Sequence, residues 1–311
     1  MVIYPEPLKE SATLAAISPA GPVDPEEFER GCVEISRFGY RIVRLPSAGR
    51  TGSYLAGDDP ARAKDVMDAF CDDHFNGVIC TRGGYGSMRI LPLLDFNQLV
   101  QHPKFFVGFS DISALQWALW KQTRLVTFSG PQLAKGWGGG LTEFSRSCWL
   151  KAARGEIWDS PLPFPEEAGD LRAKLYVHRP GSAEGRLLGG NLAVLASLAG
   201  TPFAPQFADA ILLLEEIDEP PYRIDRMLTQ LVFSGALKGV RGVVLGRFLQ
   251  HTEEGEKEWS SLAASLLASA LPGAPILTGA PYGHVEDCWT VPLGAWASVN
   301  AKGSSLVLQR I

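Results

Sequence analysis

The first half of the chain alternates short apolar runs with segments in which apolar residues recur at helical spacing. The helical segments open on capping Asp-Pro pairs or close on Gly. The pattern predicts strands at residues 13–17, 40–45, 77–81, 104–108 and 125–128, and helices at residues 24–39, 59–70, 111–119 and 141–153. Strands and helices that alternate in this way are typical of a parallel sheet covered on both faces. We therefore expect an α/β domain over residues 1–155.

Residues 156–183 interrupt this alternation. They are rich in Pro, Gly, Glu and Asp and have weak periodicity, which is typical of an inter-domain linker. Beyond them, the pattern predicts strands at residues 210–214, 242–245, 276–278, 289–291 and 305–308, and helices at residues 222–233 and 259–270. We therefore expect a second, strand-rich α/β domain over residues 184–311.

Composition is consistent with this picture. A chain of 311 residues is long enough for two domains, and 46% hydrophobic with 20% charged residues is usual for a globular protein in water. A net charge of −5 without a block of Lys or Arg argues against nucleic acid or an anionic membrane as partner. The five cysteines are scattered, and the N-terminus lacks a signal-peptide pattern. We expect a cytoplasmic protein with reduced thiols.

A serine stands where the fourth predicted strand gives way to a helix. The apolar run ends at Gly108, and helical spacing begins just past Ser110. A sharp turn there lifts a side chain beyond the carboxyl end of the strand, where parallel sheets bind ligands. The stretch is similar to the nucleophile elbow G-x-S-x-G, but Ile112 occupies the last glycine position. Ser110 is either a nucleophile or a helix N-cap, and Asp111 suits the first helical turn.

A glycine-rich segment, residues 81–87, directly follows the third predicted strand. Glycines let the backbone approach a ligand and direct N–H groups at an anion. A dinucleotide fingerprint is incomplete because Arg89 stands at its third glycine position, and no P-loop Lys follows. The segment is either an ordinary tight turn or an oxyanion site shared with the amide that follows Ser110.

A catalytic serine needs a general base, and the chain contains five histidines: His74, His102, His178, His251 and His284. The first four lie in charged, proline-bearing or linker segments that we expect to be solvated. His284 follows Pro-Tyr-Gly just past a buried strand, where the backbone turns out of the sheet toward a cleft. It is the candidate base, with a purely structural role as the alternative.

The base in turn needs an orienting carboxylate. The most apolar strand of the second half leads into the acidic segment 215–219, and Glu215 is its first polar residue. Glu215 is therefore expected at the rim of the sheet. A solvated acidic loop paired with Arg223 and Arg226 is the alternative. The sequence shows no spacing typical of a metal site, so we expect neither a metal nor another cofactor.

Five motifs, in order along nearly the whole chain, resemble the LD-carboxypeptidase family of serine peptidases. They are Arg-Gly-Gly-Tyr-Gly at 82–86, Gly-Phe-Ser-Asp at 108–111, Gly-Gly-Asn-Leu at 189–192, Leu-Glu-Glu at 214–216 and Gly-His at 283–284. The family includes murein tetrapeptide carboxypeptidases and microcin C self-immunity peptidases. The resemblance implies an α/β fold with an N-terminal Rossmann-like parallel-sheet domain, similar to that of glutamine amidotransferases, and a smaller, strand-rich C-terminal domain.

The resemblance also implies catalytic roles. Ser110, on the first domain, would form a Ser-His-Glu triad with Glu215 and His284 of the second. Glu215 matches the family's first acid after the strand.

Further roles concern the substrate. The oxyanion donors would be the amides of Asp111 and of a loop glycine, for which we choose Gly84 over Gly83. Arg82 or the backbone near Gly83 would bind the substrate's terminal carboxylate. Asn191 would contact substrate, with a helix N-cap as the alternative.

The implied activity is that of a cytoplasmic L,D-carboxypeptidase. It would release the C-terminal D-alanine of murein tetrapeptide in cell-wall recycling and act, as family members often do, as a homodimer. A second hypothesis is an immunity-type peptidase that cleaves an acyl-adenylate conjugate, with Trp137 as an aromatic platform for the base. A third is a non-catalytic module that binds a small anionic ligand through the glycine loop.

Overall fold

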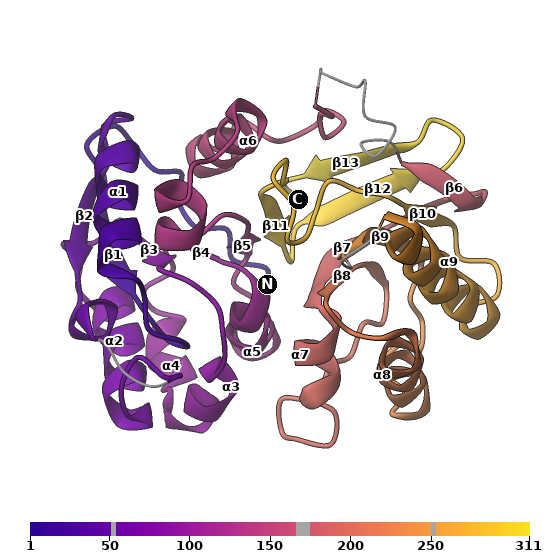
Figure 1. The fold of residues 1–311 in the computed structure, drawn as a ribbon, viewed down its shortest axis with the longest axis horizontal. Coiled ribbons are helices and arrows are strands. Elements are labelled where there is room, and N and C mark those ends of the chain that lie inside the picture. Colours follow the sequence, from indigo (N-terminus) through magenta and orange to yellow (C-terminus); the bar gives the residue numbers. More distant parts are fainter. Residues whose placement is uncertain (51–53, 166–174, 250–252) are drawn as a thin grey trace. The chain divides into compact units, whose positions relative to one another are not determined.

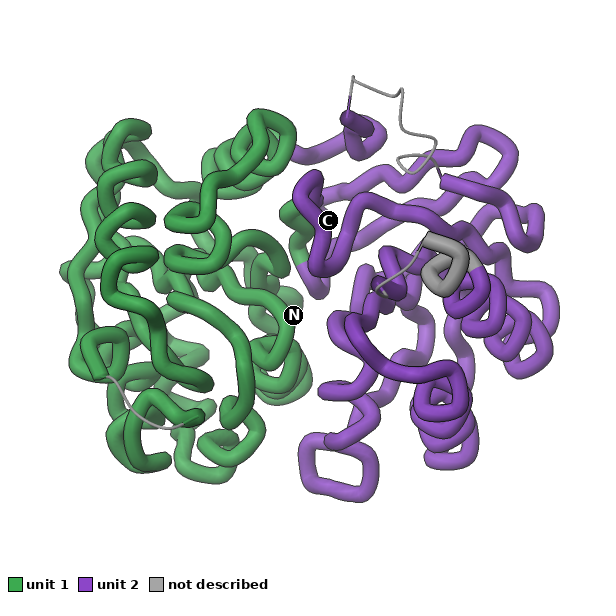
Figure 2. Tube along the Cα trace, viewed as in Figure 1, with its two compact units in different colours: residues 1–156, 290–292 green, residues 157–289, 293–311 purple. Residues whose placement is uncertain are grey.

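The computed structural model describes residues 1–50, 54–165, 175–249 and 253–311. The chain forms two compact units, coloured separately in Figure 2. Unit 1 comprises Met1–Glu156 and Thr290–Pro292, and unit 2 comprises Ile157–Trp289 and Leu293–Ile311. Of the helices in the described residues, none has both the length and the apolar character needed to cross a membrane.

Unit 1 is built on a six-stranded sheet in the order β11-β5-β4-β3-β1-β2. Its strands are β1 (Thr13–Ile17), β2 (Arg41–Arg44), β3 (Gly77–Cys80), β4 (Phe105–Gly108), β5 (Thr127–Ser129) and β11 (Val291–Leu293). The neighbours from β2 through β5 pair in parallel. Every residue of β3 and β4 is buried, as expected of central strands covered on both faces. The predicted parallel α/β fold is confirmed.

Helices cover this sheet on both sides. They are α1 (Pro25–Ser36), α2 (Asp59–Cys71), α3 (Ser87–Ile90), α4 (Phe96–Leu99), α5 (Ser113–Thr123) and α6 (Glu143–Arg154). Figure 1 shows α1 and α6 on one side, with α2 and α5 on the other. The side chain of Asp24 accepts hydrogen bonds from the first turn of α1, and Asp58 caps α2 in the same way, so the Asp-Pro pattern located both helix starts.

One strand of this first sheet comes from near the C-terminal end of the chain. The sequence pattern assigns residues 289–291 to the second domain, but β11 belongs to the sheet of unit 1, next to β5. Gly130, directly after β5, leaves the space that Thr290 fills, since a Cβ atom at Gly130 would lie 2.5 Å from Oγ1 of Thr290. The second domain, expected over residues 184–311, therefore does not include Thr290–Pro292, which belong to unit 1.

Unit 2 is built on a seven-stranded sheet in the order β13-β12-β7-β8-β9-β10-β6. Its strands are β6 (Tyr176–Arg179), β7 (Ser182–Asn191), β8 (Ala210–Ile217), β9 (Gly242–Leu249), β10 (Ile276–Thr278), β12 (Trp296–Asn300) and β13 (Ser305–Gln309). The central strands β7 to β10 are parallel, and the outer strands are antiparallel. Its helices are α7 (Leu192–Ser197), α8 (Pro221–Phe233) and α9 (Glu253–Ala270).

Part of the predicted linker is a strand of this second sheet. Strand β6 and the start of β7 fall within residues 156–183, while residues 166–174 lie outside the described part of the chain. Tyr176 and Val177 of β6 are exposed, so this edge strand lacks the alternation of apolar and polar residues that periodicity detects. Backbone pairing with β10, rather than burial of side chains, maintains it.

Candidate active site

Ser110 lies on a strained turn between β4 and α5. Its φ angle is 63°, a left-handed conformation that residues with side chains seldom adopt. A Cβ atom at Gly108 would lie 2.5 Å from Cγ2 of Ile112. The glycine two positions before the serine thus makes room for the isoleucine two positions after it, which accounts for the departure from the G-x-S-x-G pattern.

The glycine loop after β3 packs directly against this turn. A Cβ atom at Gly83 would lie 2.9 Å from Cβ of Ser110 and 3.2 Å from the backbone nitrogen of Asp111. Gly84 has a φ angle of 101° and faces Gly21, in the loop after β1. The carboxyl ends of three parallel strands therefore converge at Ser110, at the edge where α/β sheets bind ligands.

Asp111 fastens the serine turn to the glycine loop. The backbone N–H of Ser87 donates to Oδ2 of Asp111 over 2.8 Å, and Oγ of Ser87 donates to the backbone oxygen of Asp111 over 2.5 Å. Burial raises the pKa of Asp111, although hydrogen bonds from Ser87 and Gly86 oppose that rise. The side chain of Asp111 is thus a structural anchor, and its backbone amide lies beside Gly83.

Arg82, at the start of the loop, retains hydrogen-bonding capacity. Nη1 of Arg82 donates to the backbone oxygen of Pro22 over 3.2 Å. Its buried Nε atom has no hydrogen-bond partner among the described residues. A guanidinium beside a glycine loop places positive charge where an anionic ligand could bind.

In unit 2, His284 and Glu215 form a hydrogen-bonded pair. Nδ1 of His284 lies 2.9 Å from Oε2 of Glu215. A carboxylate only accepts, so Nδ1 carries the hydrogen and Nε2 is the basic nitrogen. The Glu215 side chain is fully buried, whereas that of His284 is 24% exposed. Gly283 has a φ angle of 135°, and a Cβ atom there would lie 3.3 Å from Oε2 of Glu215, so glycine is the residue that fits before this histidine.

The surroundings of His284 favour its protonated form. Burial by itself lowers the pKa of His284, but the hydrogen bond to Glu215, followed by the charges of Glu215, Glu216 and Asp218, leaves this pKa above its ordinary value. An imidazolium that forms during a reaction is therefore stabilised.

Asn191 combines a capping role with a contact to the carboxylates. Its Oδ1 accepts from the backbone N–H of Val194 over 3.1 Å, so Asn191 is the N-cap of α7. Its Nδ2 donates to Oε1 of Glu215 over 3.1 Å and to Oε1 of Glu216 over 3.0 Å. The parallel register, in which Asn191 stands opposite Glu215, brings these groups together. The predicted N-cap is thus present, and the contact of Asn191 with substrate stays a prediction.

Trp137 does not offer the aromatic platform that the adenylate hypothesis requires. It is 2% exposed and lies edge-on to Trp149, with ring centroids 5.2 Å apart. It belongs to a π-helical turn, Leu133–Gly138, that packs against α1. The expectation of a base platform at Trp137 is wrong, because this indole is part of the core.

The predicted site residues fall into two clusters. Those of unit 1 are Arg82, Gly83, Gly84, Ser110 and Asp111, and those of unit 2 are Asn191, Glu215 and His284. Sequence reasoning did not assign Glu216 to the site, although the pair of consecutive acids after an apolar strand was the available signal. In the described part of the chain, no three His, Cys, Asp or Glu side chains form a group that could hold a metal ion.

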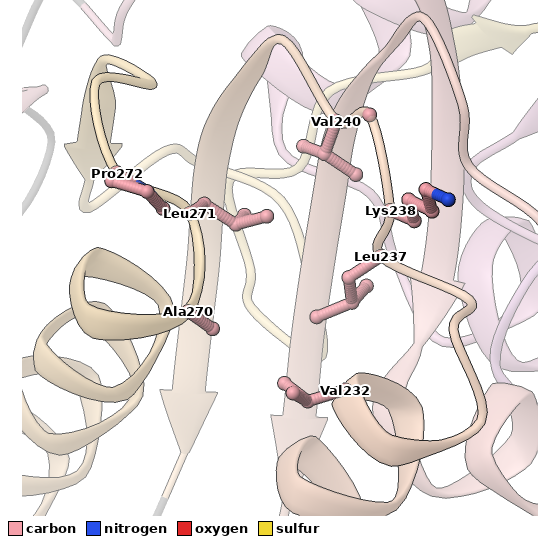
Figure 3. Close-up of a pocket in the computed structure, with 8 residues that line it drawn as sticks. Val232, Leu237, Lys238, Val240, Ala270, Leu271 and Pro272 are labelled. Atoms are coloured by element: carbon pink, nitrogen blue, oxygen red, sulfur yellow. The ribbon is translucent and has the colours of Figure 1, made fainter.

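A hollow of about 440 Å³ in unit 2 lies away from these residues. Figure 3 shows it between the segment that follows α8 and the C-terminal end of α9. The side chains that line it are apolar apart from that of Lys238. It borders the start of β9, at the opposite end of the parallel strands from Glu215, and its lining residues offer no nucleophile with a base beside it.

Comparison with known proteins identifies the family. Models of the LD-carboxypeptidase N-terminal and C-terminal domains match residues 14–130 and 184–299. The chain is 34% identical to the probable murein peptide carboxypeptidase of Bacillus subtilis (strain 168), over 98% of this chain and 94% of that protein.

Two solved structures have the same fold. The muramoyltetrapeptide carboxypeptidase from Oxalobacter formigenes superimposes with a TM-score of 0.79 at 31% identity, covering 96% of this chain and 98% of that one. An MccF-like protein from Bacillus anthracis str. Ames superimposes with a TM-score of 0.87 at 27% identity, covering 99% and 100%. The chain therefore belongs to the LD-carboxypeptidase family and is, by that membership, a serine-type carboxypeptidase.

Proposed function

We propose that this carboxypeptidase releases the C-terminal D-alanine of murein tetrapeptide, with Ser110 as nucleophile, His284 as general base and Glu215 as the carboxylate that orients the imidazole. The observation that carries the proposal is the left-handed backbone of Ser110, with a φ angle of 63°. Strain of this kind persists where a side chain must project from a sharp strand-to-helix turn. The hydrogen bond between His284 and Glu215 supports the assignment of the base.

The chemistry follows from these roles. Oγ of Ser110 attacks the carbonyl carbon of the last peptide bond, and Nε2 of His284 takes the hydroxyl proton. The C–N bond then breaks, and His284 returns the proton to the departing amine of D-alanine. The remaining acyl group is then bound to Oγ of Ser110 as an ester. Water, activated by the same imidazole, hydrolyses this ester and restores the serine hydroxyl. Glu215 stabilises the imidazolium without itself becoming protonated.

Unit 1 supplies groups for the charges on the substrate. We propose the amides of Asp111 and Gly84 as donors to the oxyanion, because Gly83, between Arg82 and Gly84, lies against the serine turn without a side chain in the way. Arg82, at the start of the glycine loop, is proposed to bind the terminal carboxylate through its guanidinium.

The choice of substrate rests on the relatives. The relatives named for murein peptides are 34% and 31% identical to this chain, against 27% for the MccF-like neighbour. The burial of Trp137 removes the aromatic group on which the adenylate hypothesis depended. A cytoplasmic role in cell-wall recycling, as a homodimer, completes the proposal.

Mass spectrometry after incubation with murein tetrapeptide tests it. Wild type should release one alanine, and Ser110→Ala should lose about 10⁴-fold or more of that rate. Ser261→Ala, at an exposed serine of α9, is the matched control and should keep the wild-type rate. Turnover by Ser110→Ala at the control rate would refute the mechanism.

The same assay separates the alternatives. Cleavage of an acyl-adenylate conjugate in place of the tetrapeptide would establish the immunity-type activity. Inertness of the folded wild type toward both substrates would favour a binding module.

A further inference from the structure

Beside Glu215 lies a second buried carboxylate that the triad does not use. Glu216 is 3% exposed. Its Oε2 accepts from the backbone N–H of Ala193 over 2.7 Å. Its Oε1 accepts from Nδ2 of Asn191 over 3.0 Å and from the backbone N–H of Ile217 over 2.9 Å. Within the described residues, each hydrogen-bonding neighbour of this side chain is a donor, so the site matches an acceptor-only carboxylate.

Asn191 links this carboxylate to the reacting pair. Nδ2 of Asn191 donates to Oε1 of both Glu215 and Glu216, and Oε2 of Glu215 holds His284. The four side chains thus form one continuous hydrogen-bonded chain. A change at Glu216 therefore reaches His284 through two intervening groups.

An irregularity in strand β8 brings the consecutive residues Glu215 and Glu216 to the side-chain amide of Asn191. Successive side chains of a regular strand point to opposite faces, yet Glu215 and Glu216 both reach Asn191. The register of β8 with β9 shifts between Leu214 and Glu216, at this same place. Irregularities of this kind are frequent next to active sites, where they redirect a side chain.

We propose that Glu216 is a positioning residue of the reaction: with Asn191 it fixes the Glu215 carboxylate, and its negative charge acts on His284 together with that of Glu215. The inference rests on the proposed function. It extends that function by a residue that touches neither the substrate nor the reacting atoms.

The charges around His284 decide the direction in which Glu216 shifts its pKa. The charges of Glu215, Glu216 and Asp218 each raise the pKa of His284. The residue of β9 opposite Glu216 is the buried, uncharged Phe248. Burial first, and the charge of Glu215 second, raise the pKa of Glu216 to about 7, against the opposing effect of its hydrogen bonds. The Glu216 side chain is therefore mostly ionised only above neutral pH. In that range its negative charge stabilises the imidazolium form of His284.

Titration of His284 by NMR in the full-length protein tests the inference without substrate. Glu216→Gln removes the negative charge. It also places an amide N–H group opposite one of the three N–H groups that donate to Glu216. The pKa of His284 should fall relative to wild type. Glu184→Gln, at an exposed position near the start of β7, is the control of equal charge change and should leave the His284 titration unchanged.

Kinetics on murein tetrapeptide provide the second readout. Glu216→Gln should lower kcat about tenfold with little change in KM, and should move the acid limb of the pH profile of kcat to lower pH. Glu216→Asp keeps the charge but shortens the reach to Asn191, so kcat should fall while the acid limb stays near its wild-type position.

A titration and acid limb of Glu216→Gln identical to those of Glu184→Gln would overturn the inference. If Glu216→Gln does not fold, an acid limb of Glu216→Asp displaced from that of wild type would overturn it. A wild type that releases no alanine refutes the proposed function instead, and the His284 titration still decides the role of Glu216.

Discussion

At the scale of single residues, glycines determine where the side chains of the proposed triad lie. The absence of a side chain at Gly108 leaves space for Ile112, and its absence at Gly83 lets the glycine loop pack against Ser110. At Gly283 it lets the backbone pack against Glu215 directly before His284. In each case the space for a Cβ atom is already occupied or tightly confined. The glycines of these motifs are therefore steric requirements of the site.

The approach of Gly83 to Ser110 yields a prediction. Gly83→Ala would place a methyl group 2.9 Å from Cβ of Ser110 and displace either the loop or this proposed nucleophile. We expect kcat/KM to fall about 100-fold, because a displacement of about 1 Å costs that much, with thermal unfolding little changed. Gly303→Ala, whose nearest neighbour would be 3.5 Å away, is the control. Wild-type kcat/KM in Gly83→Ala would show that the loop does not define the site.

The elevated pKa of His284 predicts the pH dependence. In the proposed mechanism the imidazole must be neutral to accept the serine proton, so kcat/KM should rise as pH increases through the pKa of His284 and fall below it. Glu215→Gln removes the negative charge that raises this pKa and replaces one of the two acceptor oxygens by an amide donor. The acid limb should therefore move to lower pH, with kcat reduced about 10⁴-fold. An acid limb unchanged in Glu215→Gln would mean that another group controls it.

At the scale of elements, α1 and the π-helical turn touch backbone to backbone. A Cβ atom at Gly138 would lie 1.8 Å from the backbone oxygen of Glu27, and one at Gly31 would lie 2.3 Å from that of Leu133. The same packing encloses Trp137. The arrangement of the elements, and not the residue type, thus decides that this tryptophan is structural.

This contact can be tested by unfolding. Gly31→Ala gains about 1 kcal/mol of helix propensity within α1, but its methyl group meets backbone that cannot turn aside. The clash should prevail, with a net loss of about 1–3 kcal/mol in the free energy of unfolding measured in urea. Gly49→Ala meets only the flexible Arg44 side chain, at 3.4 Å, and serves as control. A stabilised Gly31→Ala would show that α1 can move away from the turn.

At the scale of the whole molecule, the chain returns to its first unit after building most of the second. Residues Thr290–Pro292 belong to unit 1, and β11 completes its sheet beside β5. The stability of the first sheet therefore depends on residues more than a hundred positions beyond it.

Hydrogen exchange can detect this dependence. Val291→Asp places a charge at a fully buried position of β11 and should cost about 3 kcal/mol or more. Amide protection should fall in β5 and β4, far away in the sequence. Val177→Asp, at an exposed position of β6, should change little. Loss of protection confined to the second sheet would contradict the assignment of β11 to the first.

Much of the fold was open to prediction because its signals are local. Apolar runs, Asp-Pro caps and helical spacing located strands β1 to β5 and helices α1, α2, α5 and α6, but not the short helices α3 and α4. The Gly-Phe-Ser-Asp stretch located the serine turn. The edge strand β6 escaped because its exposed side chains carry no alternation. The bridging role of Asn191 escaped because it depends on the register of β7 against β8.

The sequence by itself determined the alternation of strands and helices, the placement of Ser110 at a strand end and of His284 after a buried strand, and the family. These features are encoded in residues close together along the chain. Only the tertiary structure decided that β11 joins the first sheet, that Trp137 is buried and that Glu216 lies within the hydrogen-bonded network of His284. Strand pairing and burial depend on which distant segment packs against a residue, and no local pattern records that choice.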